Sequence, residues 1–264
     1  MRIFTFQDNS VSEFATSNAL DSLEQLNLSE GHFVWLSCSR TEFGQRQVEI
    51  QSALQRLCAV ELVDLHVSDL LNPHLSSGYD FTSEYDVLIF RRLSAPNSAL
   101  TESTNPPKVR RKNRRHTLPI LRQVDTSPIG FVVLDRLLLS VHPDDCILRD
   151  GFAQRLLVAG GGMHNQAHHG TSNDARSTGA RGVPTNPADL MLRIINHAVD
   201  GFLLLRRELS QQLDNWQADL LSPNSRGANW HALLDARQTL HQLDETCEDQ
   251  RAAIRAWIEA LKTW

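Results

Sequence analysis

The sequence predicts an α/β fold in which helices cover a sheet (an α/β/α sandwich), followed by a long antiparallel helical hairpin. Three observations support this prediction. Short apolar runs of strand type occur together with an amphipathic segment between residues 1 and 157. Apolar residues spaced three or four apart run from residue 187 to residue 221. A second helical pattern follows from about residue 228 to residue 264.

Residues 1–157 are expected to form the sheet and its covering helices. Residues 45–57 have helical spacing, and residues 94–128, which contain Pro106 and Pro107, are expected to form a long inserted loop. A tight antiparallel turn is predicted at Asp135, which separates the last two strand-like runs. The strand-like runs are residues 32–37, 86–90, 129–134 and 136–141.

Two long helices are expected in residues 187–264. Pro187 suits a first helical turn, and turn-forming residues at 222–227 separate the two patterns. We expect an apolar ladder on the second helix to be covered by the first helix or by a further helical segment. The ladder consists of Leu233, Leu240, Cys247, Ile254 and Leu261, with Leu243, Trp257 and Trp264 three residues after three of these positions.

The apolar period of the second helix is still in phase at Trp264, and no Gly, Asn or Pro ends the helix there. We therefore expect the sequence to be the front part of a longer protein. No segment approaches the run of about 18 apolar residues that a membrane helix requires, so this part is expected to be soluble. Two apolar stretches of about 20 residues encoded downstream would confirm the expectation.

Composition excludes several classes of protein. The hydrophobic content of 41% supports a core, and a net charge of -5 does not indicate a nucleic-acid partner. The four cysteines, Cys38, Cys58, Cys146 and Cys247, form no Cys-x-x-Cys pair. They are interpreted as buried thiols in a reducing compartment, not as a zinc ribbon or a disulfide scaffold.

Residues 108–116 form a basic cluster with six Lys or Arg in nine residues. The absence of an interleaved aromatic residue for base stacking favours a solvated loop over a nucleic-acid interface. Contact with anionic lipid stays open, because clustered Lys and Arg are attracted to acidic headgroups.

Residues 158–186 are expected to form a flexible loop rich in Gly and Asn. His164 and His168 are spaced as a zinc-binding pair on a helix would be, and His169 follows them. Glycines at 160–162 and at 170 oppose a helix there, so a loop without a metal site is favoured.

No catalytic constellation is visible. The sequence contains neither a Gly-x-Ser-x-Gly elbow nor a Gly-x-x-x-x-Gly-Lys phosphate loop. The carboxylates of Asp144 and Asp145 follow Pro143 and are interpreted as turn residues. We therefore predict no catalytic residue, no organic cofactor and no enzymatic activity.

The order of several segments resembles the cytoplasmic domain of the CorA-type divalent cation transporters, a family that includes the ZntB zinc transporters. Residues 64–72 resemble the family's His-x-Leu-x-Glu-Asp-hydrophobic-Leu-Asn segment, although Ser68 stands where many members carry Glu. Residues 77–80 replace the Arg-Pro-Lys that usually follows. The other similar segments are Phe-Val-Trp-Leu at 33–36, Tyr-Asp-Val-Leu-Ile-Phe at 85–90, Leu-Leu-Leu-Ser-Val-His at 137–142 and the helix opening at 189–202.

The resemblance implies a regulatory or funnel domain at the cytoplasmic face of the bacterial inner membrane. It implies Mg²⁺, Co²⁺ or Zn²⁺ as the transported ion, Mg²⁺ or Zn²⁺ as a regulatory ion, a homopentamer, and a membrane region beyond residue 264. Asp69 matches the aspartate of the family's Glu-Asp pair, which faces a carboxylate of a neighbouring subunit. Asp200 matches a helix aspartate of the family. Both are expected as ligands of a regulatory cation, since a hard cation bridges carboxylates that repel one another when it is absent.

Two other classes of function stay open. One is a soluble α/β scaffold or signalling protein that oligomerises through its C-terminal helices, which their coiled-coil-like pattern favours. The other is a metal-dependent enzyme that uses the histidine-containing loop, although no general base accompanies those histidines.

Overall fold

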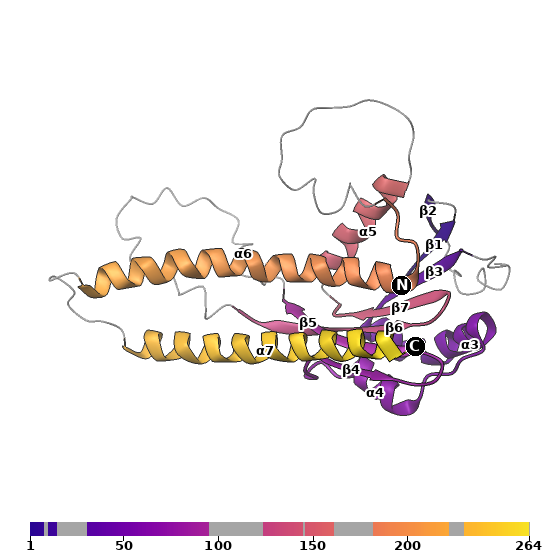
Figure 1. Cartoon of the computed structure of the whole chain (residues 1–264), viewed down its shortest axis with the longest axis horizontal. Helices are drawn as coiled ribbons and strands as arrows, with labels where there is room; N and C mark the ends of the chain where they lie inside the picture. Colours follow the sequence, from indigo (N-terminus) through magenta and orange to yellow (C-terminus); the bar gives the residue numbers. More distant parts are fainter. Residues whose placement is uncertain are drawn as a thin grey trace, which may run out of the picture.

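The computed structural model describes residues 1–7, 10–14, 31–94, 124–144, 146–160, 182–221 and 230–263. These residues form a seven-stranded sheet with helices on both faces, and two long helices extend past the sheet (Figure 1). This architecture confirms the predicted α/β class. The basic cluster at 108–116 and His164, His168 and His169 lie outside the described residues.

The sheet is mixed. β3 and β7 are parallel neighbours, and every other described pair of neighbouring strands is antiparallel. The order across the sheet is β2-β1-β3-β7-β6-β5-β4. The strands are β1 (Arg2–Gln7), β2 (Ser10–Glu13), β3 (Phe33–Ser39), β4 (Gly78–Phe81), β5 (Asp86–Leu93), β6 (Thr126–Val133) and β7 (Leu137–His142).

The four strands that the sequence predicts are confirmed as β3, β5, β6 and β7. The tight turn at Asp135 is also present, since the Leu134 N–H donates to the Leu137 carbonyl at 2.9 Å. β6 begins at Thr126, so the last three residues of the expected 94–128 insertion belong to the sheet.

One face of the sheet is covered by α2 (Arg40–Gln45), α3 (Gln47–Cys58) and α4 (Asp64–Leu71). Ser39 and Glu42 form a capping box at the start of α2, in which each side chain binds the other residue's N–H. The predicted helix at 45–57 is thus α3, preceded by a short helix that ends where Arg46 leaves the helical conformation.

The other face is covered by α5 (Ile147–Gly160), α6 (Pro187–Leu221) and α7 (Trp230–Thr263). α5 continues through residues 158–160, where the sequence predicts the start of a flexible loop. Val183, near the expected end of that loop, is buried in the same core as α6. The two ends of the predicted 158–186 loop thus belong to the packed structure, and residues 161–181 lie outside the described residues.

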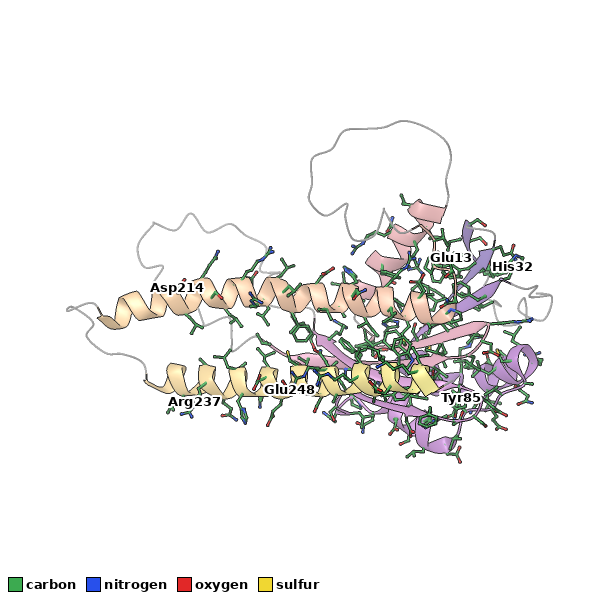
Figure 2. All side chains as sticks on the ribbon, viewed as in Figure 1. Glu13, His32, Tyr85, Asp214, Arg237 and Glu248 are labelled. Atoms are coloured by element: carbon green, nitrogen blue, oxygen red, sulfur yellow. The ribbon has the colours of Figure 1, made fainter. Side chains whose placement is uncertain are left out.

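α6 and α7 lie side by side and antiparallel, and Asp214 and Arg237 mark the part that extends past the sheet (Figures 1 and 2). Leu209 of α6 and Ala236 and Leu243 of α7 share a small apolar cluster. Leu93 at the end of β5 and Val124, two residues before β6, pack against that cluster. The hairpin is therefore joined to the sheet as well as to itself.

Only part of the predicted ladder on α7 is buried: Leu243 and Trp257 are buried as predicted, whereas the described heptad positions are not. Cys247 is exposed, the Leu261 side chain is 51% exposed, and Leu240 and Ile254 are only half-buried. Leu233 and Trp264 have no described side chain. The correction has a physical reason: α7 packs on β4 and β5, and this sheet edge selects the neighbouring stripe of the helix. The buried stripe is Ala236, Leu243, Gln250, Ala253 and Trp257.

Candidate cation-sensing site

Asp69 lies in the last turn of α4, with its side chain half-buried. Its neighbours Val67 and Leu70 point into the core, which fixes the side of α4 that can face outward. Leu70 lies directly over Gly130 of β6, where an added Cβ would be 2.3 Å from the Leu70 Cδ2 atom. The glycine therefore allows α4 to approach the sheet closely.

A buried histidine clamps α4 to the edge of the sheet. His66 Nδ1 lies 2.9 Å from the Tyr85 hydroxyl, and His66 Nε2 lies 3.2 Å from Asp80 Oδ2. The Tyr85 oxygen also accepts from the Val63 N–H at 3.0 Å. With the neutral Nε2–H tautomer, Tyr85 donates to His66 and His66 donates to Asp80, so each group has a partner. The bond from His66 is the main cause of the lowered pKa of the Asp80 carboxyl.

Asp200 lies on α6 with its side chain exposed. Leu190, Ile194 and Ala198 of the same helix point into the core on the opposite face of the sheet from α4. Asp69 and Asp200 of one copy are therefore separated by the sheet. Within the described part of the chain, no group of three or more His, Cys, Asp or Glu side chains is placed to hold a metal ion.

Sequence reasoning did not find a second buried histidine, His142, at the end of β7. Its Nε2 lies 2.9 Å from the Ser140 Oγ and its Nδ1 lies 3.4 Å from the Cys146 sulfur. Burial lowers the pKa of His142 to about 3 and raises the pKa of the Cys146 thiol. Because a reactive cysteine needs a lowered pKa and some exposure, this pair holds the start of α5 and is not an activated nucleophile.

A cavity of about 360 Å³ lies where α7 ends. It is lined by the β4–β5 turn, the β6–β7 turn, the start of α6 and Leu261 of α7. Glu84, Asp86 and Asp135 give its lining an acidic character, and the Tyr85 hydroxyl connects it to the His66 clamp. Tyr85 lies close to the C-terminal end of α7 (Figure 2). The Tyr79 hydroxyl donates to Asp86 at 2.7 Å, so one of these carboxylates already has a partner.

None of the described helices has a segment long and apolar enough to span a bilayer. No family model and no curated protein matches the sequence. The sheet, the helices on its two faces and the projecting helices nevertheless define the fold of the cytoplasmic domains of CorA-type divalent cation transporters. The predicted fold resemblance is confirmed.

Three solved structures carry this comparison. Full-length CmaX is similar over 100% of this chain and 63% of its own, with a TM-score of 0.59 and 13% identity. The ZntB cytoplasmic domain from Vibrio parahaemolyticus RIMD 2210633 is similar over 98% of this chain and 79% of its own, with a TM-score of 0.58 and 13% identity. The complete CorA magnesium transporter from Methanocaldococcus jannaschii is similar over 95% of this chain and 60% of its own, with a TM-score of 0.56 and 12% identity. This chain thus spans less than two thirds of the two full-length proteins.

Proposed function

We propose that this chain is the cytoplasmic regulatory domain of a CorA-like divalent cation transporter, at the cytoplasmic face of the inner membrane. The observation that carries the proposal is the shared fold, which extends over nearly the whole chain and includes the two long helices. The proposed cargo is Mg²⁺, Co²⁺ or Zn²⁺. The membrane pore belongs to a part of the protein outside residues 1–264.

The open flank of α7 supports assembly with further copies of the chain. The predicted ladder positions Leu240, Cys247, Ile254 and Leu261 form an apolar stripe that this copy covers only in part, and Ile258 beside them is also exposed. A heptad-spaced apolar stripe is the pattern by which helices associate along their length. We propose a homo-oligomer, a pentamer by resemblance, that packs through this stripe.

Asp69 and Asp200 lie on opposite sides of the sheet in one copy, so they cannot bind the same cation within that copy. A cation held by either carboxylate needs further oxygen ligands, because Mg²⁺ prefers six oxygens around it. We propose that a neighbouring copy of the chain supplies these further oxygen ligands. Binding of Mg²⁺ or Zn²⁺ then stabilises the assembly, and loss of the cation weakens the contact between copies.

Association measured with and without cation tests this site. In sedimentation velocity, MgCl₂ is expected to shift the chain toward larger species, and Asp69→Asn is expected to weaken that shift. Asp64→Asn on the same helix and Glu208→Gln on α6 are matched controls, since both positions are exposed. An identical response of Asp69→Asn and the unchanged chain would remove Asp69 from the site; the same comparison applies to Asp200→Asn.

Transport is tested on the intact gene. Deleting the gene that encodes this chain is expected to lower the uptake of one of the three cations, and re-expression restores it. The alternative is a scaffold or signalling protein that associates through its C-terminal helices. Unchanged uptake of all three cations, together with self-association through α7, would favour that alternative.

A further inference from the structure

We infer that Gln250 is a latch that sets the position of α7 along its own axis on the sheet, and that α7 can leave this position while the α/β domain stays folded. Gln250 is 8% exposed, and it is the only polar residue among the buried side chains described for α6 and α7. Its side-chain Nε2 donates to the main-chain carbonyl of Arg91 on β5 at 2.6 Å.

The partner of Gln250 is a carbonyl that the sheet itself leaves open. β4 pairs with β5 only as far as Ile89, opposite Gly78. Beyond this point the main chain of Arg91 faces the side where β4 would continue. Its N–H donates to the Ser77 Oγ at 3.0 Å, and its carbonyl accepts from Gln250. Main-chain polar groups that leave water need hydrogen-bond partners. Gln250 supplies the partner of the Arg91 carbonyl, and this is possible at only one axial position of α7.

The other contacts of the buried α7 seam do not fix the axial position of α7. Ala236, Leu243, Gln250 and Trp257 follow one another at intervals of seven residues along the seam. The contacts of the three apolar members are non-directional, so they do not fix the axial position of α7. A helix that slides by one turn exchanges one set of apolar contacts for another, as packed helices do in known switches. A single buried polar residue in such a seam is a recognised device for selecting one register.

A second observation indicates that the docked position is not fully satisfied. The Trp257 side chain is 2% exposed, and its indole Nε1–H has no hydrogen-bond acceptor within the described part of the chain. An unpaired buried donor disfavours the conformation that holds it. The seam thus contains one hydrogen bond that retains α7 and, two turns away, one buried donor without a partner that disfavours the docked position.

The latch predicts a second position of α7 when Gln250 is replaced. Spin labels on the exposed native Cys247 and on Val48→Cys of α3 report the distance along α7, because α3 lies beyond the C-terminal end of α7 (Figure 1). Half-buried Cys58 is changed to Ser to prevent labelling there, while Cys38 and Cys146 are buried. Excess unlabelled protein keeps the measured distance within one copy.

The parent is expected to show one distance by double electron–electron resonance. Gln250→Met, which keeps the shape and removes the donor, is expected to add a second distance displaced by about 5 Å, one helical turn. Ser77→Ala is the matched control, because it removes the other hydrogen bond to the Arg91 main chain and leaves the Gln250 side chain unchanged. It is expected to keep one distance.

A single, unchanged distance in Gln250→Met would overturn the latch. A second distance in both Gln250→Met and Ser77→Ala would also overturn it, since loosening of the β5 edge in general would then explain the result. If Gln250→Met does not fold, Gln250→Asn keeps the amide but is too short to reach Arg91, and the same criteria apply to it.

Discussion

Adding one methyl group at Gly130 is expected to disturb the helix that carries Asp69. A Cβ at this position would lie 2.3 Å from Leu70 Cδ2 and 3.3 Å from Ile89 Cδ1. Carbon atoms in contact lie about 3.5–4.0 Å apart, so Leu70 must move by more than about 1 Å. Leu70 is buried and cannot turn into solvent. We expect Gly130→Ala to lower the free energy of unfolding by about 1–3 kcal/mol, the usual cost of overpacking.

A double-mutant cycle identifies the cause. Leu70→Ala alone is expected to cost about 2–5 kcal/mol because it leaves a cavity. In the double variant, the new methyl group occupies part of that cavity, so its cost is expected to be smaller than the sum by about 1 kcal/mol or more. Urea unfolding followed by the fluorescence of buried Trp35 and Trp257 measures all three variants.

The matched control is Gly151→Ala in α5, where an added Cβ meets nothing within 4 Å. This change is expected to be neutral or to stabilise the helix by up to about 1 kcal/mol. A neutral Gly130→Ala, or strictly additive costs in the double variant, would show that α4 does not depend on the close approach at Gly130.

Three further predictions concern the rest of the molecule. Leu243→Ala is expected to cost more than Leu240→Ala in urea unfolding, about 2–5 kcal/mol against about 1 kcal/mol, because Leu243 is buried and Leu240 is only half-buried; the reverse order of costs would contradict the assignment of Leu243 to the buried seam. The pKa of His142 is about 3 when folded against 6.5 ordinarily, so the unfolded chain binds the extra proton and stability falls from about pH 6.5 toward pH 3, by at most about 1.4 kcal/mol per pH unit; His142→Gln is expected to flatten this slope, and an unchanged slope would refute the assignment. Deleting residues 161–181 is expected to leave the melting temperature within a few degrees, whereas a deletion that also removes Val183, buried in the core, is expected to lower it clearly; equal losses would contradict this contrast.

The sequence predicts the elements whose apolar pattern is long or strongly strand-like. α6 is predicted from Pro187 to residue 221 because its apolar period continues without interruption. β4 is missed because it has only four residues and begins with Gly78. α5 is missed because its apolar residues follow no clear helical period and Gly151 lies inside it. Local pattern is weak in such segments, and tertiary contacts decide their structure.

The candidate site could be located on helices but not assembled from sequence. The resemblance selects Asp69 and Asp200, and periodicity alone does not show that the sheet separates them. In the clamp, His66 of α4 contacts Asp80 of β4, 14 residues away, and Tyr85 of the β4–β5 turn, 19 residues away. No short sequence motif predicts this contact, because the contact depends on the pairing of β4 with β5.

The choice between the two apolar stripes of α7 shows what the sheet adds to the helical pattern. The more regular apolar repeat on α7 is Leu240, Cys247, Ile254 and Leu261, since the other stripe contains the polar Gln250. The apolar pattern alone therefore favours burial of a stripe that the structure leaves partly exposed. The Arg91 carbonyl adds a polar contribution to the stripe that is buried, since only Gln250 donates to it among the described residues of α7. This hydrogen bond therefore acts together with the apolar contacts of Leu243 and Trp257, and the stripe of Leu240, Cys247, Ile254 and Leu261 stays partly exposed. The position of α7 in this chain thus decides which surface of the helix is available to another copy.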